Sequence, residues 1–98
     1  TDIFEFDSNG GDAFVSVDTI HNFDETDFDK IDISDILSGL GVNAGNLAQF
    51  VDISAGVGVR VDVTGSGSFG AGTQIASFSG TTTVTDEATL LTNGQLLI

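Results

Sequence analysis

Acidic side chains crowd into the stretch Asp18–Leu37, DTIHNFDETDFDKIDISDIL. Four of them fall within six residues: Asp24, Glu25, Asp27 and Asp29. The first base in this part of the chain is Lys30, and like charges this close repel, so a folded turn here requires full solvation or a bound cation. Ca²⁺ takes carboxylate, carbonyl and water oxygens as ligands, and the turn offers almost nothing else. The stretch therefore indicates an acidic turn that either is solvated or binds Ca²⁺.

The sequence on either side of this turn is typical of strands. Asp18-Thr19-Ile20 places an acid two positions before a branched apolar residue, and Asp29-Lys30-Ile31 repeats that arrangement. We therefore expect one strand, the acidic turn, a second strand, and then the start of a helix or a tight turn that reaches Leu37.

The composition limits the size of the protein and the partners it can take. Ninety-eight residues are enough for one domain with one core. The net charge of −13 argues against binding to nucleic acid or to anionic membranes. Eleven of the fifteen acids lie within residues 1–35, which separates an acidic segment, residues 1–37, from a Gly/Ser/Thr/Val-rich remainder, residues 38–98. Because the chain has no cysteine, it has neither disulfides nor a thiolate metal site.

Alternation and helical spacing predict the elements that position the acidic stretch. We expect strands at Thr1–Asp7, Asp12–Phe23, Val57–Thr64, Gln74–Ser79 and Gln95–Ile98. We expect short helices at Asn43–Val51 and Asp86–Thr92, the second with Thr85 as its N-cap. The strand at 57–64 has its four valines on one face, and we expect it to pair in antiparallel fashion with the strand at 74–79. These elements make an all-β domain with two short helices.

A partial nonapeptide repeat lies before the acidic stretch. Asp7–Val15, DSNGGDAFV, carries Gly10, Asp12 and Phe14 where the Ca²⁺-binding repeat GGxGxDxUx has its third glycine, its aspartate and its large apolar residue. The first two glycines of that repeat are replaced by Asp7 and Ser8. Asp2-Ile3-Phe4 has the same Asp-x-apolar spacing.

Five segments in a fixed order carry a resemblance to a known family. They are DIFEFD at 2–7, DTIHNF at 18–23, DKIDISDIL at 29–37, VRVDVTGSG at 59–67 and TLLTNGQLLI at 89–98. In these segments the chain resembles the C-terminal type I secretion target domain of RTX (repeats-in-toxin) proteins, especially of giant bacterial adhesins. The resemblance covers essentially the whole chain.

The resemblance implies a role in export rather than a reaction. Such domains cap the open end of a Ca²⁺-dependent parallel β-roll made by upstream RTX repeats of the same chain. They also carry an uncleaved C-terminal signal that is read by an ABC transporter, a membrane-fusion protein and an outer-membrane channel. We therefore expect a non-enzymatic, monomeric C-terminal piece of a longer protein that is secreted or displayed on the bacterial cell surface. In fold terms, short β-roll-like N-terminal strands are expected to pass into an antiparallel sheet.

The resemblance also implies two sets of functional residues. The candidate Ca²⁺ ligands at the end of the β-roll are Asp2, Asp12, Asp18 and Asp29; the alternative is that these are acidic residues that keep a strand edge soluble. The candidate secretion signal is Leu90, Leu91, Leu96, Leu97 and Ile98; the alternative is a core strand that closes the domain. The two roles of the terminal segment are compatible if the signal is read before folding and buried afterwards.

Several features depart from the family or leave alternatives open. The chain lacks one complete GGxGxDxUx repeat, and Asn22-Phe23 stands where family members often have Asp-Phe. Two other functions are a Ca²⁺-dependent ligand-binding adhesin module and the non-catalytic tail of a secreted RTX enzyme. The absence of Trp and Tyr argues against the first where the ligand is a sugar. We expect His21 to be a surface strand residue, and Arg60 to offset Asp62 or an acid on the neighbouring strand.

Overall fold

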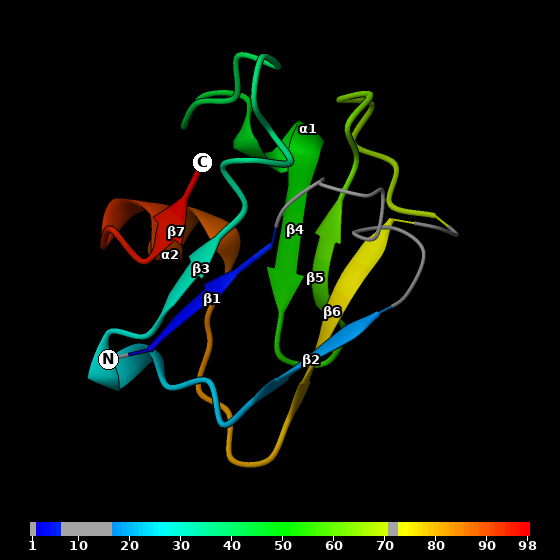
Figure 1. The fold of residues 1–98 in the computed structure, drawn as a ribbon. Coiled ribbons are helices and arrows are strands. Elements are labelled where there is room, and N and C mark those ends of the chain that lie inside the picture. Colours follow the sequence, from blue (N-terminus) through cyan, green and yellow to red (C-terminus); the bar gives the residue numbers. More distant parts are fainter. Residues whose placement is uncertain (1, 7–16, 71–72) are drawn as a thin grey trace.

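The computed structural model describes residues 2–6, 17–70 and 73–98, and these form two sheets and two short helices (Figure 1). The strands are β1 (Ile3–Glu5), β2 (Asp18–His21), β3 (Lys30–Asp32), β4 (Val51–Ser54), β5 (Gly58–Val61), β6 (Gln74–Ser79) and β7 (Leu96–Leu97). The helices are α1 (Leu47–Phe50) and α2 (Glu87–Thr92), and a 3₁₀ helix spans Glu25–Asp27. The expectation of a small, mainly-β fold with two short helices is confirmed.

The chain alternates between the two sheets. The first sheet has the order β1-β3-β7 and is parallel throughout. The second has the order β2-β6-β5-β4, in which β2 runs parallel to β6 and the other neighbours are antiparallel. In the series β1, β2, β3, β6 and β7, each strand therefore lies in the other sheet from the strand that precedes it in the series. The β4–β5 hairpin is inserted between β3 and β6.

The antiparallel pairing predicted for the valine-rich strand is confirmed, but the strand is shorter than expected. β5 spans Gly58–Val61 and pairs with β6 through Val59 opposite Ala76. Val59 and Val61 are fully buried, whereas Val57 and Val63, which flank the strand, are 40% and 42% exposed. The outer two valines of the expected strand therefore lie beyond its ends, and only Val59 and Val61 lie in β5 and face the core.

The helix in the structure is shorter at both ends than the one expected over Asn43–Val51. The last residue of the expected helix begins a strand that the sequence analysis missed. Only Leu47–Phe50 is helical, and Val51–Ser54 forms β4. Val51 and Ile53 are buried and alternate with half-buried neighbours, as expected of a strand with one face on the core. β4 pairs in antiparallel fashion with β5, with Val51 opposite Val61.

Helix α2 is capped by Asp86 and not by Thr85. The Asp86 carboxylate accepts a hydrogen bond from the backbone N–H of Thr89 at 2.8 Å. A carboxylate is favourable at this end of a helix because it accepts from a free N–H and faces the positive end of the helix dipole. Gly94 follows the helix with φ +73°, the left-handed conformation that glycine adopts at low cost.

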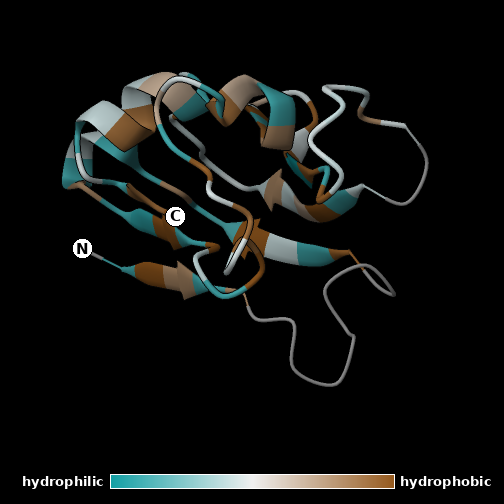
Figure 2. Cartoon of the chain, turned by 90° about the horizontal axis from the view of Figure 1, so that it is seen from above, coloured by the Kyte–Doolittle hydropathy of each residue, from teal (hydrophilic) through white to brown (hydrophobic). Residues whose placement is uncertain are grey.

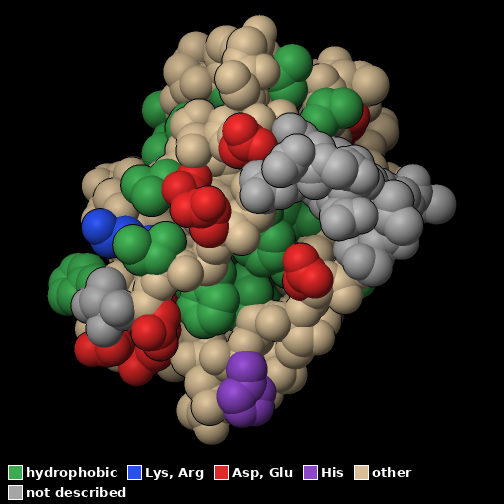
Figure 3. Space-filling model, viewed as in Figure 1, with side chains coloured by type: hydrophobic (Ala, Val, Ile, Leu, Met, Phe, Trp, Pro, Cys, Tyr) green, Lys and Arg blue, Asp and Glu red, His purple; other side chains and the backbone are tan. Residues whose placement is uncertain are grey.

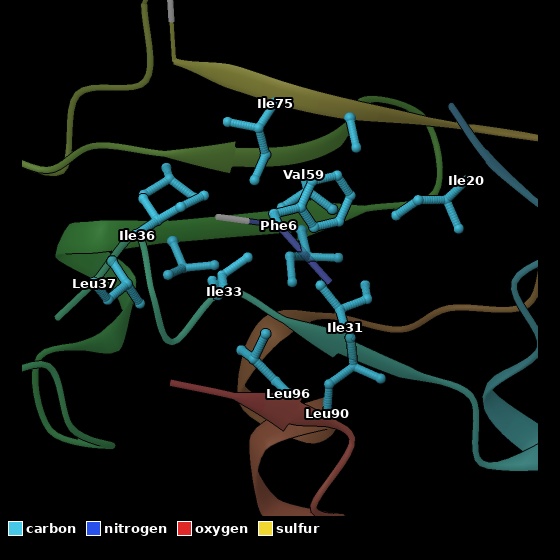
Figure 4. Close-up of a cluster of buried hydrophobic side chains, with 14 of the residues drawn as sticks. Phe6, Ile20, Ile31, Ile33, Ile36, Leu37, Val59, Ile75, Leu90 and Leu96 are labelled. Carbon is cyan, nitrogen blue, oxygen red and sulfur yellow. The ribbon is translucent and has the colours of Figure 1, made fainter. Parts of the chain in front are cut away.

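The core lies between the two sheets. Hydrophobic and hydrophilic residues alternate along the strands (Figure 2). In Figure 4, Ile31, Ile33 and Leu96 of the parallel sheet and its flanks lie across from Val59 and Ile75 of the second sheet, all 2% exposed or less. Apolar side chains from both sheets therefore share one core.

One part of the predicted pattern lies outside the described residues. It comprises Asp7–Val15, which matches half a nonapeptide repeat, and the first residues of the strand expected at Asp12–Phe23. Within the described residues, no helix is long and apolar enough to cross a membrane.

Candidate functional site at the acidic turn and the strand edges

The acidic turn between β2 and β3 is held by hydrogen bonds to hydroxyl and backbone groups. Asp24 caps the 3₁₀ helix, and its Oδ1 accepts from the Thr26 N–H at 2.9 Å and from the Thr26 hydroxyl at 2.6 Å. The same oxygen accepts from the Thr83 hydroxyl at 2.9 Å. The Thr26 hydroxyl, followed by that of Thr83, holds the pKa of Asp24 below its usual range. This carboxylate is therefore ionised and engaged within the fold.

Asp29 joins the turn to the first strand. Its side chain is buried, with the residue 3% exposed, and each carboxylate oxygen accepts from a backbone N–H. Oδ1 accepts from Asp2 at 2.8 Å, and Oδ2 accepts from Asp24 at 2.9 Å. A buried carboxylate requires such partners, because an uncompensated charge away from water is costly. Asp29 thus fixes the start of β1 against the turn.

Gln95 connects the same turn to the C-terminal segment. The residue is 1% exposed, and its Nε2 donates to the backbone carbonyls of Glu25 and Asp29, both at 3.0 Å. Its Oε1 is buried and has no hydrogen-bond partner among the described residues. Nothing in the local sequence distinguishes Gln95 from a surface glutamine, so the sequence analysis placed it only in a terminal strand.

The structure brings together two of the four candidate Ca²⁺ ligands. Asp2 and Asp29 meet through the Asp2 N–H, while Asp18 is exposed at the start of β2, in the other sheet. Asp12 lies outside the described residues. Across residues 2–6, 17–70 and 73–98, no three His, Asp or Glu side chains gather as a metal site. The assignment of these four ligands stays a prediction.

The N-terminal strands β1 and β2 form the edges of the two sheets. The backbone hydrogen bonds between β1 with its flanking residues and β3 involve the even-numbered residues of the first segment. The Lys30 N–H donates to Asp2 O at 2.8 Å, and the Phe6 N–H donates to Asp32 O at 2.9 Å. In a strand, the backbone groups of Ile3 and Glu5 then point away from β3. Among the described strands, β1 pairs only with β3, and β2 only with β6. Figure 3 shows this face, where acidic side chains surround exposed hydrophobic ones.

The opposite edges are covered. Helix α2 packs against both β4 and β7, the last strands of the two sheets. The half-buried Glu87 of α2 accepts a hydrogen bond from the Ile53 N–H of β4 at 3.0 Å. A side chain that satisfies an edge N–H blocks the addition of another strand there. The molecule therefore has one protected end and one end where β1 and β2 lie at the sheet edges.

The candidate signal residues differ in their burial. Leu90 and Leu96 are buried, at 0% and 2% exposed, and Leu91 and Ile98 are half-buried against the core, whereas Leu97 is half-buried without being part of that packing. The interpretation of this segment as a core strand that closes the domain matches their packing. Its interpretation as a signal stays a prediction, and it concerns the unfolded chain rather than this packing.

Two further polar clusters were only partly anticipated. Arg60 pairs with Asp52, directly across the β4–β5 ladder, and lies 5.5 Å from the centre of the Phe69 ring. Asp62 accepts hydrogen bonds from Ser66 and Thr64, which lower its pKa to about 2. The Asp62 cluster could have been found from the sequence, because an aspartate two residues before a hydroxyl side chain favours a turn of the backbone.

The single histidine lies where the sequence analysis expected it, but it has a partner that was not foreseen. The Nδ1 atom of His21 lies 2.8 Å from the hydroxyl of Ser79, its register partner on β6. The contact is exposed at the end of the strand pair.

Comparison of the chain with protein-family models, with curated proteins and with solved structures gives no match.

Proposed function

We propose that this chain is a C-terminal type I secretion signal domain that caps a Ca²⁺-dependent RTX β-roll of a large secreted or surface adhesin. The observation that carries the proposal is the path of the chain between two sheets. β1 and β3 pair in parallel in one sheet, and β2 lies between them in sequence but in the other sheet. Successive coils of a β-roll have this arrangement, so an upstream coil would add parallel strands to β1 and β2.

The difference between the two ends supports the capping role. A cap needs one end that continues the coil and one that cannot be extended. Strands β1 and β2 lie at the first end, and α2 with Glu87 covers the second. In this proposal the upstream RTX repeats of the same chain are the partner at the β1–β2 edge.

The acidic composition supports export in an unfolded form. Repulsion among fifteen acids disfavours the compact state when no cation is bound. Where Ca²⁺ is plentiful, an ion bound only by the folded state stabilises it. The proposed partners in export are the ABC transporter, the membrane-fusion protein and the outer-membrane channel of a type I system. No catalytic role is part of the proposal.

The Ca²⁺ part of the proposal is tested by thermal unfolding in Ca²⁺, in EDTA and in Mg²⁺. At a Ca²⁺ concentration one hundred times the dissociation constant, we expect stabilisation of about 2.7 kcal/mol over EDTA. Mg²⁺ should give much less, because it requires a tighter, octahedral site. Asp18→Asn, at an exposed position, should reduce the Ca²⁺ effect and leave stability in EDTA unchanged. Equal melting in Ca²⁺ and EDTA would remove Ca²⁺ binding from the account of this chain.

The secretion-signal part of the proposal is tested with a passenger protein that carries this chain at its C-terminus. In this chain, four leucines are replaced by asparagine, one at a time. Leu90→Asn and Leu96→Asn remove buried side chains and should lower stability by about 2–5 kcal/mol. The half-buried Leu91→Asn and Leu97→Asn should cost less. If the unfolded segment is read, loss of export should not follow this order of stability. Unchanged export in all four variants would contradict the assignment of the signal to these residues.

A further inference from the structure

Asn93 and Gly94 join helix α2 to strand β7 (Figure 1). The sequence contains two Asn-Gly pairs, and this is the one that lies among the described residues. Both residues are exposed, and no atom lies within 4 Å of the place where a Cβ of Gly94 would be. Glycine carries no side chain to hinder its own backbone nitrogen. The pair thus provides both partners for the attack of a backbone nitrogen on a side-chain amide.

In the folded protein, the Gly94 nitrogen is held in the last turn of α2. Its N–H donates to Leu91 O at 3.1 Å, and the Asn93 backbone has ψ 0°. At that angle the Gly94 nitrogen eclipses the backbone nitrogen of Asn93, whereas ring closure on the side chain requires it to eclipse the Cβ. The necessary rotation would break the bond to Leu91. It would also displace Gln95, which is 1% exposed. The fold therefore holds the pair away from the reactive geometry.

We propose that Asn93 is a deamidation site that reacts in the unfolded chain and is protected by folding. The Gly94 N–H gives its proton to a solvent base, and the nitrogen forms a bond to Asn93 Cγ. The Cγ–Nδ2 bond breaks and the amide leaves as ammonia, so that a five-membered cyclic imide remains. One water molecule then opens the imide at either carbonyl and yields aspartate or isoaspartate. The reaction consumes one water and releases one ammonia.

Both products fit the folded structure less well than asparagine. Aspartate places a negative charge at the C-terminal end of α2, where the helix dipole is negative and the last turn has no base. Isoaspartate adds a methylene group to the backbone directly before Gln95 and Leu96, which are 1% and 2% exposed. Time spent unfolded therefore weakens the protein that folds afterwards. The chemistry is independent of the proposed function, under which chains that wait unfolded before export collect the modification.

Peptide mapping measures the reaction at Asn93 directly. Trypsin cuts after the two basic residues, Lys30 and Arg60, and the resulting peptide 61–98 has Asn93 as its single asparagine. The purified chain is incubated at one mildly alkaline pH, folded in Ca²⁺-containing buffer or unfolded in urea. The mass and isoaspartate content of the peptide are followed over time. We expect deamidation to be at least about tenfold slower in the folded protein, because a reaction through an opened form follows the population of that form. Equal rates in the two states would overturn the proposal.

Two controls identify the reacting residue. Peptide 31–60 has asparagines that precede alanine and leucine, whose side chains hinder the backbone nitrogen, so it should react much more slowly in urea. Asn93→Gln changes an exposed residue and requires a six-membered ring, which closes less readily, so deamidation of peptide 61–98 should nearly disappear. An unchanged rate in Asn93→Gln would overturn the assignment to Asn93, as would a rate in the unaltered chain no higher than that of peptide 31–60.

The effect of the modification on stability is tested with Asn93→Asp, which reproduces one product. Compared with Asn93→Gln, which is uncharged at the same exposed position, we expect its melting temperature to be about 2–6 °C lower, from the charge at the end of α2. Equal melting temperatures would overturn the conclusion that deamidation to aspartate weakens the fold.

Discussion

Replacing Phe23 with alanine is expected to lower the free energy of unfolding by about 3–5 kcal/mol, the usual cost of removing a buried aromatic ring. Phe23 is 0% exposed and lies between the rings of Phe4 and Phe78, with centroids 6.0 Å and 5.7 Å away. Phe4 belongs to β1 and Phe78 to β6, so the ring joins the two sheets near their N-terminal edges. Its loss leaves a cavity and breaks two aromatic contacts.

Phe28→Ala is the matched control for this prediction, because Phe28 lies in the same turn but is 61% exposed. Its replacement should change stability by no more than about 0.5 kcal/mol. Urea denaturation of the two variants measures the difference. Similar losses in both would show that Phe23 does not join the sheets in solution.

Gly58→Ala is expected to destabilise the protein by an amount on the order of 3 kcal/mol or more, from a backbone clash together with an unfavourable φ. A Cβ at Gly58 would lie 2.1 Å from the carbonyl oxygen of Ala76, and the residue has φ +115°. The obstacle is backbone on the neighbouring strand β6, so no side-chain rotation relieves it. The pairing of β5 with β6 also changes register between Val59 and Arg60, next to this close approach.

Two other glycines separate the two causes. Gly94→Ala keeps the positive φ but has open space, so it should cost only the conformational part, about 1–2 kcal/mol. Gly56→Ala has open space at an ordinary φ and should be close to neutral. Calorimetric unfolding of the three variants should rank them in that order. A cost at Gly58 no larger than that at Gly94 would contradict the close packing of β5 on β6.

Local features of the fold could be predicted because local sequence determines them. The alternation in Gln74–Ser79 and the acid-rich start of α2 mark a strand and a helix wherever the chain places them. β4 was missed because Leu47, Phe50 and Val51 fit a helical spacing, while Val51 and Ile53 also fit the alternation of a strand. Pairing with β5 decides between the two, and pairing cannot be deduced from so short a segment.

The arrangement of the candidate site could not be predicted for the same reason. The acidic turn was located correctly, but the burial of Asp29 depends on N–H groups from Asp2 and Asp24 that only the folded chain brings to it. Gln95 reaches the turn from 66 residues away. The parallel pairing of β1, β3 and β7 likewise joins segments that have no local signal for one another.

Export of a passenger protein is the measurement that tests the central claim most directly. The passenger carries this 98-residue chain at its C-terminus and is expressed with and without type I transporters from several RTX systems. We predict that at least one transporter delivers the passenger to the medium, and that the passenger stays in the cell without a transporter or when residues 85–98 are deleted. Retention in the cell with every transporter, while the chain is shown to be intact and soluble, would contradict the claim that it is a type I secretion domain.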